Sequence, residues 1–226
     1  MQGTSRRGRP PKAEAQLSRA AIREAALSVL DAEGIAAVSM RSVSRVLGVD
    51  AKSLYHHVDS KDDLLDAIVE HLLGQLRMPA PTDSLDADVR ALAHEFRRVT
   101  LAHPEAATLV LTRQLSSLSG LAPIEAVLAV LRRTGRAPEE AVHLLRTLLA
   151  TLIGTLLREV SAGPTFGTDD AEGIADRQRT LEASGLVQVA LAAPHLARFD
   201  RDREFDYTLD LLVHVVTART TESNAH

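Results

Sequence analysis

Apolar residues recur at spacings of three and four along most of this chain, which is the pattern of amphipathic helices. Strict alternation of apolar and polar residues, typical of half-buried strands, is not seen, so we predict an all-α fold. Helices are expected at residues 18–33, 40–47, 51–57, 61–77, 83–102, 104–115, 122–134, 138–161, 175–193 and 203–219. Residues 162–174, rich in Gly, Asp and Thr, are expected to form a mobile loop.

Short polar residues predict where the first four helices begin. Ser18, Ser39, Asp50 and Ser60 each precede a helical stretch, where their side chains can accept hydrogen bonds from free backbone amides. Apolar residues on both sides of three of these caps fit the hydrophobic staple that fixes the entry of the chain. Gly34 follows the first stretch and is expected to end that helix.

Bulk composition indicates an ordinary globular protein. The chain has 226 residues, 45% of them hydrophobic, and no cysteine, which excludes disulfides, a cysteine nucleophile and thiolate metal sites. The basic start, Met1–Lys12, has no apolar run and does not resemble a secretory signal. The longest apolar stretch, Leu144–Leu157, is interrupted by polar residues and falls short of the ~20 apolar residues of a membrane span. A soluble, cytoplasmic protein with no membrane association is expected.

Charge divides the chain. The net charge is −4, which taken alone argues weakly against nucleic acid as a partner. Residues 1–61, however, hold ten Lys or Arg and six Asp or Glu, so they carry +4 and the remainder carries −8. This asymmetry suggests a basic contact module on an acidic body, although chance clustering would look the same.

The segment Ser39–Lys61 carries the strongest motif. It reads SMRSVSRVLGVDAKSLYHHVDSK, a helix of about eight residues, a turn at Gly48 and a second short helix. This order is typical of a helix-turn-helix, in which the second helix enters the DNA major groove. A plain helical hairpin is the alternative, but it does not explain the polar, basic second helix. The inward face is expected to consist of Val43, Val46, Leu47, Val49, Leu54 and Val58.

Residues 18–77 resemble the DNA-binding domain of the tetracycline-repressor (TetR) family. The matching pieces are Glu33-Gly34, Ser39-Met40-Arg41, Leu47-Gly48-Val49, Leu54-Tyr55-His56-His57-Val58 and Ser60-Lys61-Asp62-Asp63-Leu64-Leu65. The resemblance implies a homodimeric regulator, mostly a repressor, that a small molecule releases from palindromic double-stranded operator DNA. It also implies a three-helix helix-turn-helix domain joined to a C-terminal helical bundle for dimerisation and ligand binding. A ligand-responsive activator is the alternative function.

The resemblance also implies roles for individual residues. Lys52 and Ser53 correspond to base-facing positions, and Arg41 to one that reaches a base or a phosphate. Tyr55 and His57 resemble phosphate contacts, as does Lys61 at a helix N-terminus. Weaker candidates for DNA contact are Ser39 and His56. For each of them the plain alternative is a solvated polar residue.

The first residues form a second candidate DNA contact. Arg6, Arg7 and Arg9 lie in the sequence RRGRPPK, which resembles an AT-hook core. Prolines keep such an arm extended, and a narrow A·T-rich minor groove attracts arginine. A solvated tail without this function is the alternative.

These observations predict three parts. Residues 1–17 would be a basic flexible arm, residues 18–77 the helix-turn-helix domain and residues 78–226 the ligand-binding and dimerisation domain, with the boundary at Pro79 and Pro81. In the last part, residues 138–161 are apolar on more than one face, as in a bundle centre or a dimer seam. The stripe Leu209, Leu212, Val213 and Val216 fits either a dimer interface or an internal core.

Polar residues on the bundle helices are candidate ligand contacts. His143, Thr147, Thr151 and Thr155 follow one line at helical spacing and could orient a small-molecule effector in an apolar pocket. Threonines that bond back to their own helix are the alternative. Further candidate ligand contacts are His94, His103 and Thr112.

No metal, cofactor or catalytic role is expected. An approximate alignment places Arg77 and Val110 where family members that bind magnesium-tetracycline have histidines, and neither residue suits Mg²⁺. The sequence contains no HExxH, Walker or GxSxG motif, so an enzyme is disfavoured. A helical protein-interaction scaffold without DNA binding remains a minor alternative.

Overall fold

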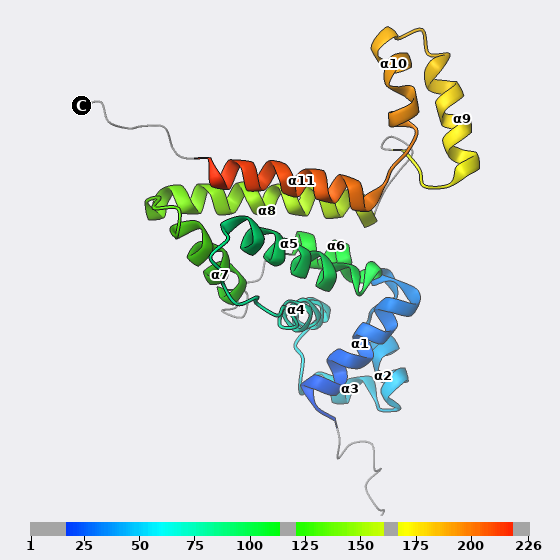
Figure 1. The fold of residues 1–226 in the computed structure, drawn as a ribbon. Coiled ribbons are helices and arrows are strands. Elements are labelled where there is room, and N and C mark those ends of the chain that lie inside the picture. Colours follow the sequence, from blue (N-terminus) through cyan, green and yellow to red (C-terminus); the bar gives the residue numbers. More distant parts are fainter. Residues whose placement is uncertain (1–16, 114–120, 161–166, 219–226) are drawn as a thin grey trace, which may run out of the picture. The chain divides into compact units, whose positions relative to one another are not determined.

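The computed structural model describes residues 17–113, 121–160 and 167–218, and these residues are mainly helical (Figure 1). These ranges contain no β-strand, only one isolated parallel bridge between Thr168 and Arg198. The predicted all-α class is therefore confirmed. The helices are α1 (Arg19–Glu33), a 3-10 turn (Ile35–Ala37), α2 (Met40–Leu47), α3 (Ala51–Leu54), α4 (Lys61–Leu73), α5 (Leu85–Leu101), α6 (Pro104–Thr112), α7 (Leu121–Arg132), α8 (Pro138–Val160), α9 (Ala171–Glu182), α10 (Val187–Leu196) and α11 (Arg201–Thr217).

Contacts between the helices divide the chain into two compact units. Unit 1 comprises residues 1–74 and 103–116, and unit 2 comprises residues 75–102 and 117–226. Unit 1 thus contains α1 to α4 together with α6, which packs against α1 and α4. The sequence pattern alone grouped α6 with the C-terminal helices, because periodicity does not reveal which element an apolar face covers.

Unit 1 is built on the apolar faces of its helices. The predicted stripe of α1 is buried, with Ile22 and Leu30 fully enclosed. Leu54 of α3 and Val43 of α2 are also fully buried, which joins the two short helices to one core. Burial of each such side chain stabilises the fold by about 1.5–3 kcal/mol.

The predicted caps are present at all four helix starts. The hydroxyls of Ser18 and Ser60 accept backbone hydrogen bonds of 3.1 Å in the first turns of α1 and α4. Ser39 and Ser42 form a reciprocal capping box at α2, and Asp50 accepts from the amide of Lys52 at 2.7 Å. Local hydrogen bonds therefore decide where these helices begin.

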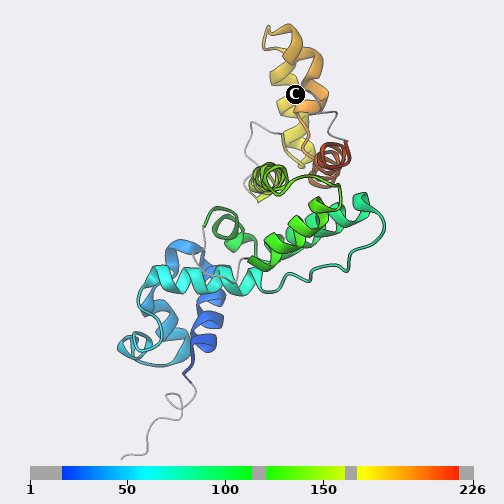
Figure 2. The same ribbon diagram turned by 90° about the vertical axis from the view of Figure 1, so that its left-hand side faces the viewer.

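Unit 2 has a core shared by α5, α7, α8 and α11. Figures 1 and 2 show α8 and α11 side by side, and Leu156 and Leu209 are fully buried between their neighbours. α8 is long and apolar enough to cross a membrane, with a mean hydropathy of 1.4. Such a helix is weak evidence for a membrane span, since long core helices have the same composition, and α8 packs on α7, α11 and α5.

One predicted helix is wrong. Residues 175–193 form parts of two helices, α9 and α10, which pack against each other as a hairpin (Figure 1). The break lies at Gly185, whose φ of 73° belongs to the left-handed region and ends helical hydrogen bonding. α9 also begins earlier than expected, at Ala171, because Asp170 caps it through the amide of Gly173 at 2.7 Å.

Candidate nucleic-acid interface

A tight turn joins α2 and α3 in unit 1. Gly48 caps α2 in the left-handed conformation, with φ 67° and ψ 31°. The amide of Val49 donates to the carbonyl oxygen of Ser44 at 3.1 Å, and Asp50 then caps α3. A residue with a Cβ is strained at this φ, so the glycine allows the short connection that a helix-turn-helix needs.

The second helix of the motif has a buried side and a solvent side. Leu54 and Val58 are buried against unit 1, whereas Lys52, Tyr55 and His56 are exposed. Ser53 and His57 are half-buried. The side chains proposed to meet DNA thus lie opposite the residues that hold α3 in place.

One inward position was predicted wrongly. Val46 of α2 is 55% exposed, whereas Ser44 is buried and donates to the carbonyl oxygen of Arg41 at 3.0 Å. A serine whose hydroxyl donates to a carbonyl of its own helix can lie in the core. Side-chain polarity alone therefore does not show which face of α2 is buried. Leu47 and Val49 are half-buried.

Ser39 and Lys61 have local partners. The Ser39 hydroxyl belongs to the α2 capping box, where it lies 3.1 Å from the amide of Ser42. Lys61, the first residue of α4, is exposed, and its side-chain nitrogen donates to the carbonyl oxygen of Ile35 at 3.4 Å. Both side chains are held near the motif by hydrogen bonds, and Lys61 forms no ion pair with a described residue.

Most cations of unit 1 outside the motif are neutralised by carboxylates. Arg19 pairs with Asp63 at 2.6 Å, and Arg23 pairs with Glu24 at 2.9 Å. Arg113, which follows α6, pairs with two residues of α4, Asp62 and Asp66. Its hydrogen bond with Asp66 raises the pKa of Arg113 further.

The cations of the helix-turn-helix are not neutralised by carboxylates of the described residues. Arg41, Arg45 and Lys52 are exposed, and none of them forms an ion pair with a described residue. Arg45 was missed by the sequence reasoning, although its position one helical turn after Arg41 is a signal that could have found it. Unneutralised positive charge therefore gathers on α2 and α3. Arg6, Arg7 and Arg9 lie outside the described residues.

The polar line of α8 bonds mostly within its own helix. The Thr147 hydroxyl donates to the carbonyl oxygen of His143 at 3.0 Å, and Thr151 donates to that of Thr147 at 2.9 Å. This is the back-bonding alternative considered above. Thr155 lies 3.4 Å from the hydroxyl of Thr208 in α11, and His143 is exposed.

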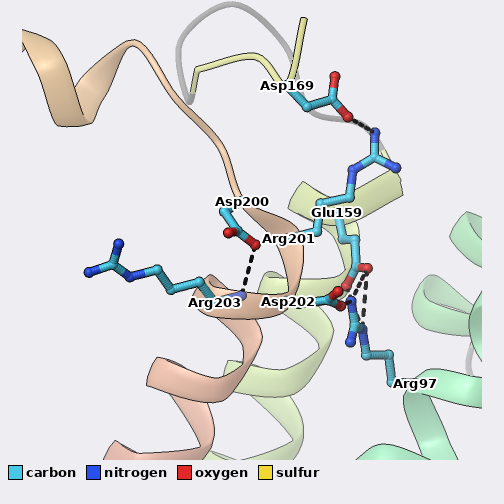
Figure 3. A network of polar contacts seen from close by, with 7 residues as sticks. All are labelled: Arg97, Glu159, Asp169, Asp200, Arg201, Asp202 and Arg203. Carbon is cyan, nitrogen blue, oxygen red and sulfur yellow. Dashed lines mark hydrogen bonds and ion pairs between the residues drawn. The ribbon is translucent and has the colours of Figure 1, made fainter.

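One other candidate, His94, lies beside a charged cluster of unit 2. His94 meets the ring of Phe205 edge-on, with centroids 5.2 Å apart, and the guanidinium of Arg97 lies 4.6 Å from the same ring centroid. Arg97 also pairs with buried Glu159 at 2.5 Å and with Asp202 at 2.6 Å (Figure 3). These contacts join α5, α8 and α11, and the hydrogen bond to Glu159 raises the pKa of Arg97.

The remaining candidates belong to unit 1. His103 precedes α6, and its Nδ1 lies 2.9 Å from a carboxylate oxygen of Asp31 in α1. Thr112 is exposed and donates to the carbonyl oxygen of Thr108 at 2.7 Å. The seven candidate ligand residues therefore do not all fall within one unit.

Thr100 of α5 was missed by the sequence reasoning. It is 1% exposed, and its hydroxyl has no hydrogen-bond partner among the described residues. An unsatisfied buried hydroxyl costs about 1–3 kcal/mol, so such a group needs an explanation. No sequence signal distinguishes it from the neighbouring threonines.

The described ranges hold no cluster of three or more His, Asp or Glu suited to a metal ion.

Comparisons with known proteins agree with this geometry. A family model described as "Tetracyclin repressor-like, C-terminal domain" matches residues 78–219, and one described as "Bacterial regulatory proteins, tetR family" matches residues 22–68. The first match alone covers more than half of the chain. The chain therefore belongs to the tetracycline-repressor family, whose members are transcriptional regulators and not enzymes.

Relatives of this chain are named as transcriptional regulators. An HTH-type transcriptional regulator of Saccharopolyspora erythraea is 41% identical over 112 residues, which are 49% of this chain and 48% of that protein. The HTH-type transcriptional repressor DrrR1 of Streptomyces coeruleorubidus is 32% identical over 177 residues, 75% of this chain and 64% of that protein. The matches thus span about half to two thirds of these relatives.

Structures of ActR from Streptomyces coelicolor superpose over nearly the whole fold. ActR in complex with actinorhodin gives a TM-score of 0.80 at 25% identity, covering 92% of this chain and 99% of that one. Apo ActR gives a TM-score of 0.77 at 26% identity, covering 91% and 99%. The helix-turn-helix and the C-terminal helical domain predicted from the sequence are both present in this fold.

Proposed function

We propose that this chain is a homodimeric transcriptional regulator that binds a palindromic operator and is released from it by a small molecule. The observation that carries the proposal is the unneutralised charge of Arg41, Arg45 and Lys52 on a helix-turn-helix. Phosphate contacts supply much of the affinity for DNA. Cations that are not paired with carboxylates can make such contacts without first breaking an ion pair. Short polar side chains on α3, such as Ser53, then read base edges in the major groove.

Dimerisation is supported by an apolar face of unit 2. The predicted stripe of Leu209, Leu212, Val213 and Val216 is intramolecular core. A second stripe on the same helix stays in solvent, with Tyr207, Leu211 and Val215 exposed by 63%, 53% and 44%. Because α8 lies beside α11 and is apolar on several sides, the two helices offer a continuous surface to a second copy. A dimer would present two α3 helices to half-sites about one DNA turn apart.

An effector site is proposed in the helical bundle of unit 2. Thr100 supports it, since a ligand would satisfy its buried hydroxyl, and His94, Thr151 and Thr155 remain candidate contacts. ActR, the structural relative, has been crystallised with actinorhodin. Ligand binding would favour a dimer geometry that no longer matches two successive grooves, and so lower DNA affinity. Replacing Thr100 by Val, which keeps the shape, should weaken effector binding and leave operator binding unchanged.

The central experiment is a gel-shift titration with DNA flanking the chain's own gene. Full-length protein should form a sequence-preferring complex at moderate salt in the presence of a polyanion competitor. If only competitor-sensitive binding appears, the regulator proposal fails and a helical scaffold becomes the better hypothesis. A reporter fused to the bound sequence then separates a repressor from an activator.

We place the protein in the cytoplasm, where its operator would be, without a cofactor or membrane partner.

A further inference from the structure

A cavity lies at the root of the α9–α10 hairpin in unit 2, and its lining includes none of the candidate effector residues. Its volume is about 530 Å³, within the range of small-molecule sites. One side is α9, and the other is formed by the chain just before α9 and by the start of α11. The lining residues are Gly167, Thr168, Asp169, Gly173, Asp176, Arg177, Thr180, Leu181, Phe199 and Arg201.

The backbone fixes the floor of this cavity. The amide of Thr168 donates to the carbonyl oxygen of Ala197 at 3.1 Å, and the amide of Phe199 donates to that of Thr168 at 3.0 Å. Gly167 has φ +99°, and a Cβ there would lie 2.6 Å from the carbonyl of Arg198. These contacts close the hairpin at its base, so the cavity has a preformed wall.

The wall supplied by α9 is unusual for a packed helix. Its five lining residues are spaced by three and four, from Gly173 to Leu181, and therefore share one face. None of the 12 residues of α9 is fully buried, although the helix packs on α10. The face that would ordinarily bury apolar side chains is instead mixed in polarity and borders open space.

Among the charged residues that line the cavity, one cation has no carboxylate partner in the described part of the chain. Asp169 and Arg201 pair at 3.5 Å (Figure 3), and Asp176 pairs with Arg179 outside the lining. Arg177 is half-buried and forms no ion pair with a described residue. Its Nε donates only to the carbonyl oxygen of Leu196, at 3.4 Å.

From this arrangement we propose that the cavity binds a small organic monocarboxylate with an apolar body. The planar guanidinium of Arg177 suits a carboxylate, since two parallel hydrogen bonds match its fork. Leu181 and Phe199 supply apolar contact for the rest of the molecule. A phosphate dianion is disfavoured, because Asp169 and Asp176 would repel its second charge. The site is separate from the effector site proposed above and does not depend on it.

The test uses full-length protein and 2-naphthoate as the probe. The chain has no tryptophan, so fluorescence anisotropy of the naphthalene is read with little protein background. One saturable site per chain is expected, and Arg177→Gln should weaken binding by about tenfold or more, the loss of a charge-assisted hydrogen bond. Arg203→Gln, which removes the same charge from an exposed position of α11 outside the lining, is the matched control and should leave the affinity within about twofold.

Two further measurements keep the outcome decisive. Neutral 2-naphthamide should bind the unaltered protein at least about tenfold more weakly, which tests the charge without any substitution. Hydrogen exchange should slow in α9 when 2-naphthoate is added. The proposal is overturned if no saturable binding occurs at millimolar 2-naphthoate, or if 2-naphthamide binds equally well. It is also overturned if a folded Arg177→Gln variant keeps full affinity, because the probe would then bind at another site.

Discussion

The side-chain nitrogen of Lys61 lies 3.4 Å from the carbonyl oxygen of Ile35, so the first residue of α4 is held against the 3-10 turn that follows α1. A single long hydrogen bond to a carbonyl leaves the ammonium charge unneutralised. A DNA phosphate could therefore replace or share this partner, next to the free amides at the start of α4. The contact keeps Lys61 near the motif without blocking its proposed role.

Replacing Lys61 by Gln should weaken operator binding and make it less sensitive to salt. Each phosphate contact contributes about −0.9 to the slope of log affinity against log salt, so losing one should reduce the slope by about that amount. Titrations at several salt concentrations measure it. Arg179→Gln, which removes the same charge from exposed α9 in unit 2, should leave the slope unchanged. Equal slopes for Lys61→Gln and the unaltered protein would remove Lys61 from the interface.

Replacing Tyr55 by Ala should abolish operator binding without unfolding unit 1. Tyr55 is 55% exposed at the end of α3, so truncation removes a surface contact and little core. Tyr55→Phe separates the hydroxyl from the ring, and it should show an intermediate loss if the hydroxyl donates to a phosphate. Circular dichroism checks the fold, and sedimentation checks the dimer. Normal DNA binding by a folded Tyr55→Ala protein would mean that α3 is not the recognition helix.

Local signals explain why the first helices could be predicted. The cap at Ser39 and the turn at Gly48 depend on residues within a few positions, and such interactions are readable from sequence. The sequence around Gly185 does not predict a break, because helix-compatible residues flank it on both sides. Only the positive φ in the folded chain shows that α9 and α10 are separate.

Faces and charge pairs depend on the tertiary fold. α11 carries two apolar stripes, and periodicity does not say whether Leu209 or Leu211 points inward. The structure buries the first and leaves the second 53% exposed. Likewise, Arg45 and Arg113 look alike in the sequence, but only Arg113 meets carboxylates, on a helix about 50 residues away in the chain. Pairing across such separations has no local pattern.

Deleting residues 1–12 should weaken operator binding and flatten its salt dependence. The segment carries Arg6, Arg7, Arg9 and Lys12, and each phosphate contact that is lost should change the log–log slope by about 0.9. An arm that reads the minor groove should also favour A·T-rich flanks of the operator. Exchanging these flanks for G·C should therefore lower the operator affinity of the 226-residue chain but not that of the chain without residues 1–12. An unchanged slope and no flank preference would show that the arm is a solvated tail.

Glu95 should make stability depend on pH in the acid range. Hydrogen bonding with Arg98, together with the amide of Arg77, lowers the pKa of Glu95 from 4.5 to about 2 against the opposing effect of burial. A folded pKa below the unfolded one gives stability that is present above pH 4.5 and is lost as the pH falls toward 2. Because Arg98 is half-exposed, this contribution is about 2 kcal/mol or less.

Urea unfolding of Glu95→Gln at pH 6, 4 and 3 measures that contribution at constant protein concentration. The variant should be less stable at pH 6, and the difference from the unaltered protein should shrink as the pH falls. Glu125→Gln changes an exposed residue of α7 and should show no such trend. A stability difference for Glu95→Gln that is the same at all three pH values would contradict the assigned cause.

Replacing Leu211 by Glu should separate the proposed dimer. Leu211 is 53% exposed in the stripe that it shares with Tyr207 and Val215, so the change adds charge where a second copy would pack but disturbs no buried contact. Burying an unpaired carboxylate is costly, and the dissociation constant should rise by about tenfold or more. Operator affinity should fall with it, because a single half-site binds weakly. Leu121→Glu changes a leucine of similar exposure, 50%, on α7, and should leave the sedimentation profile unaltered. If Leu211→Glu sediments as the unaltered dimer does, the interface lies on another face.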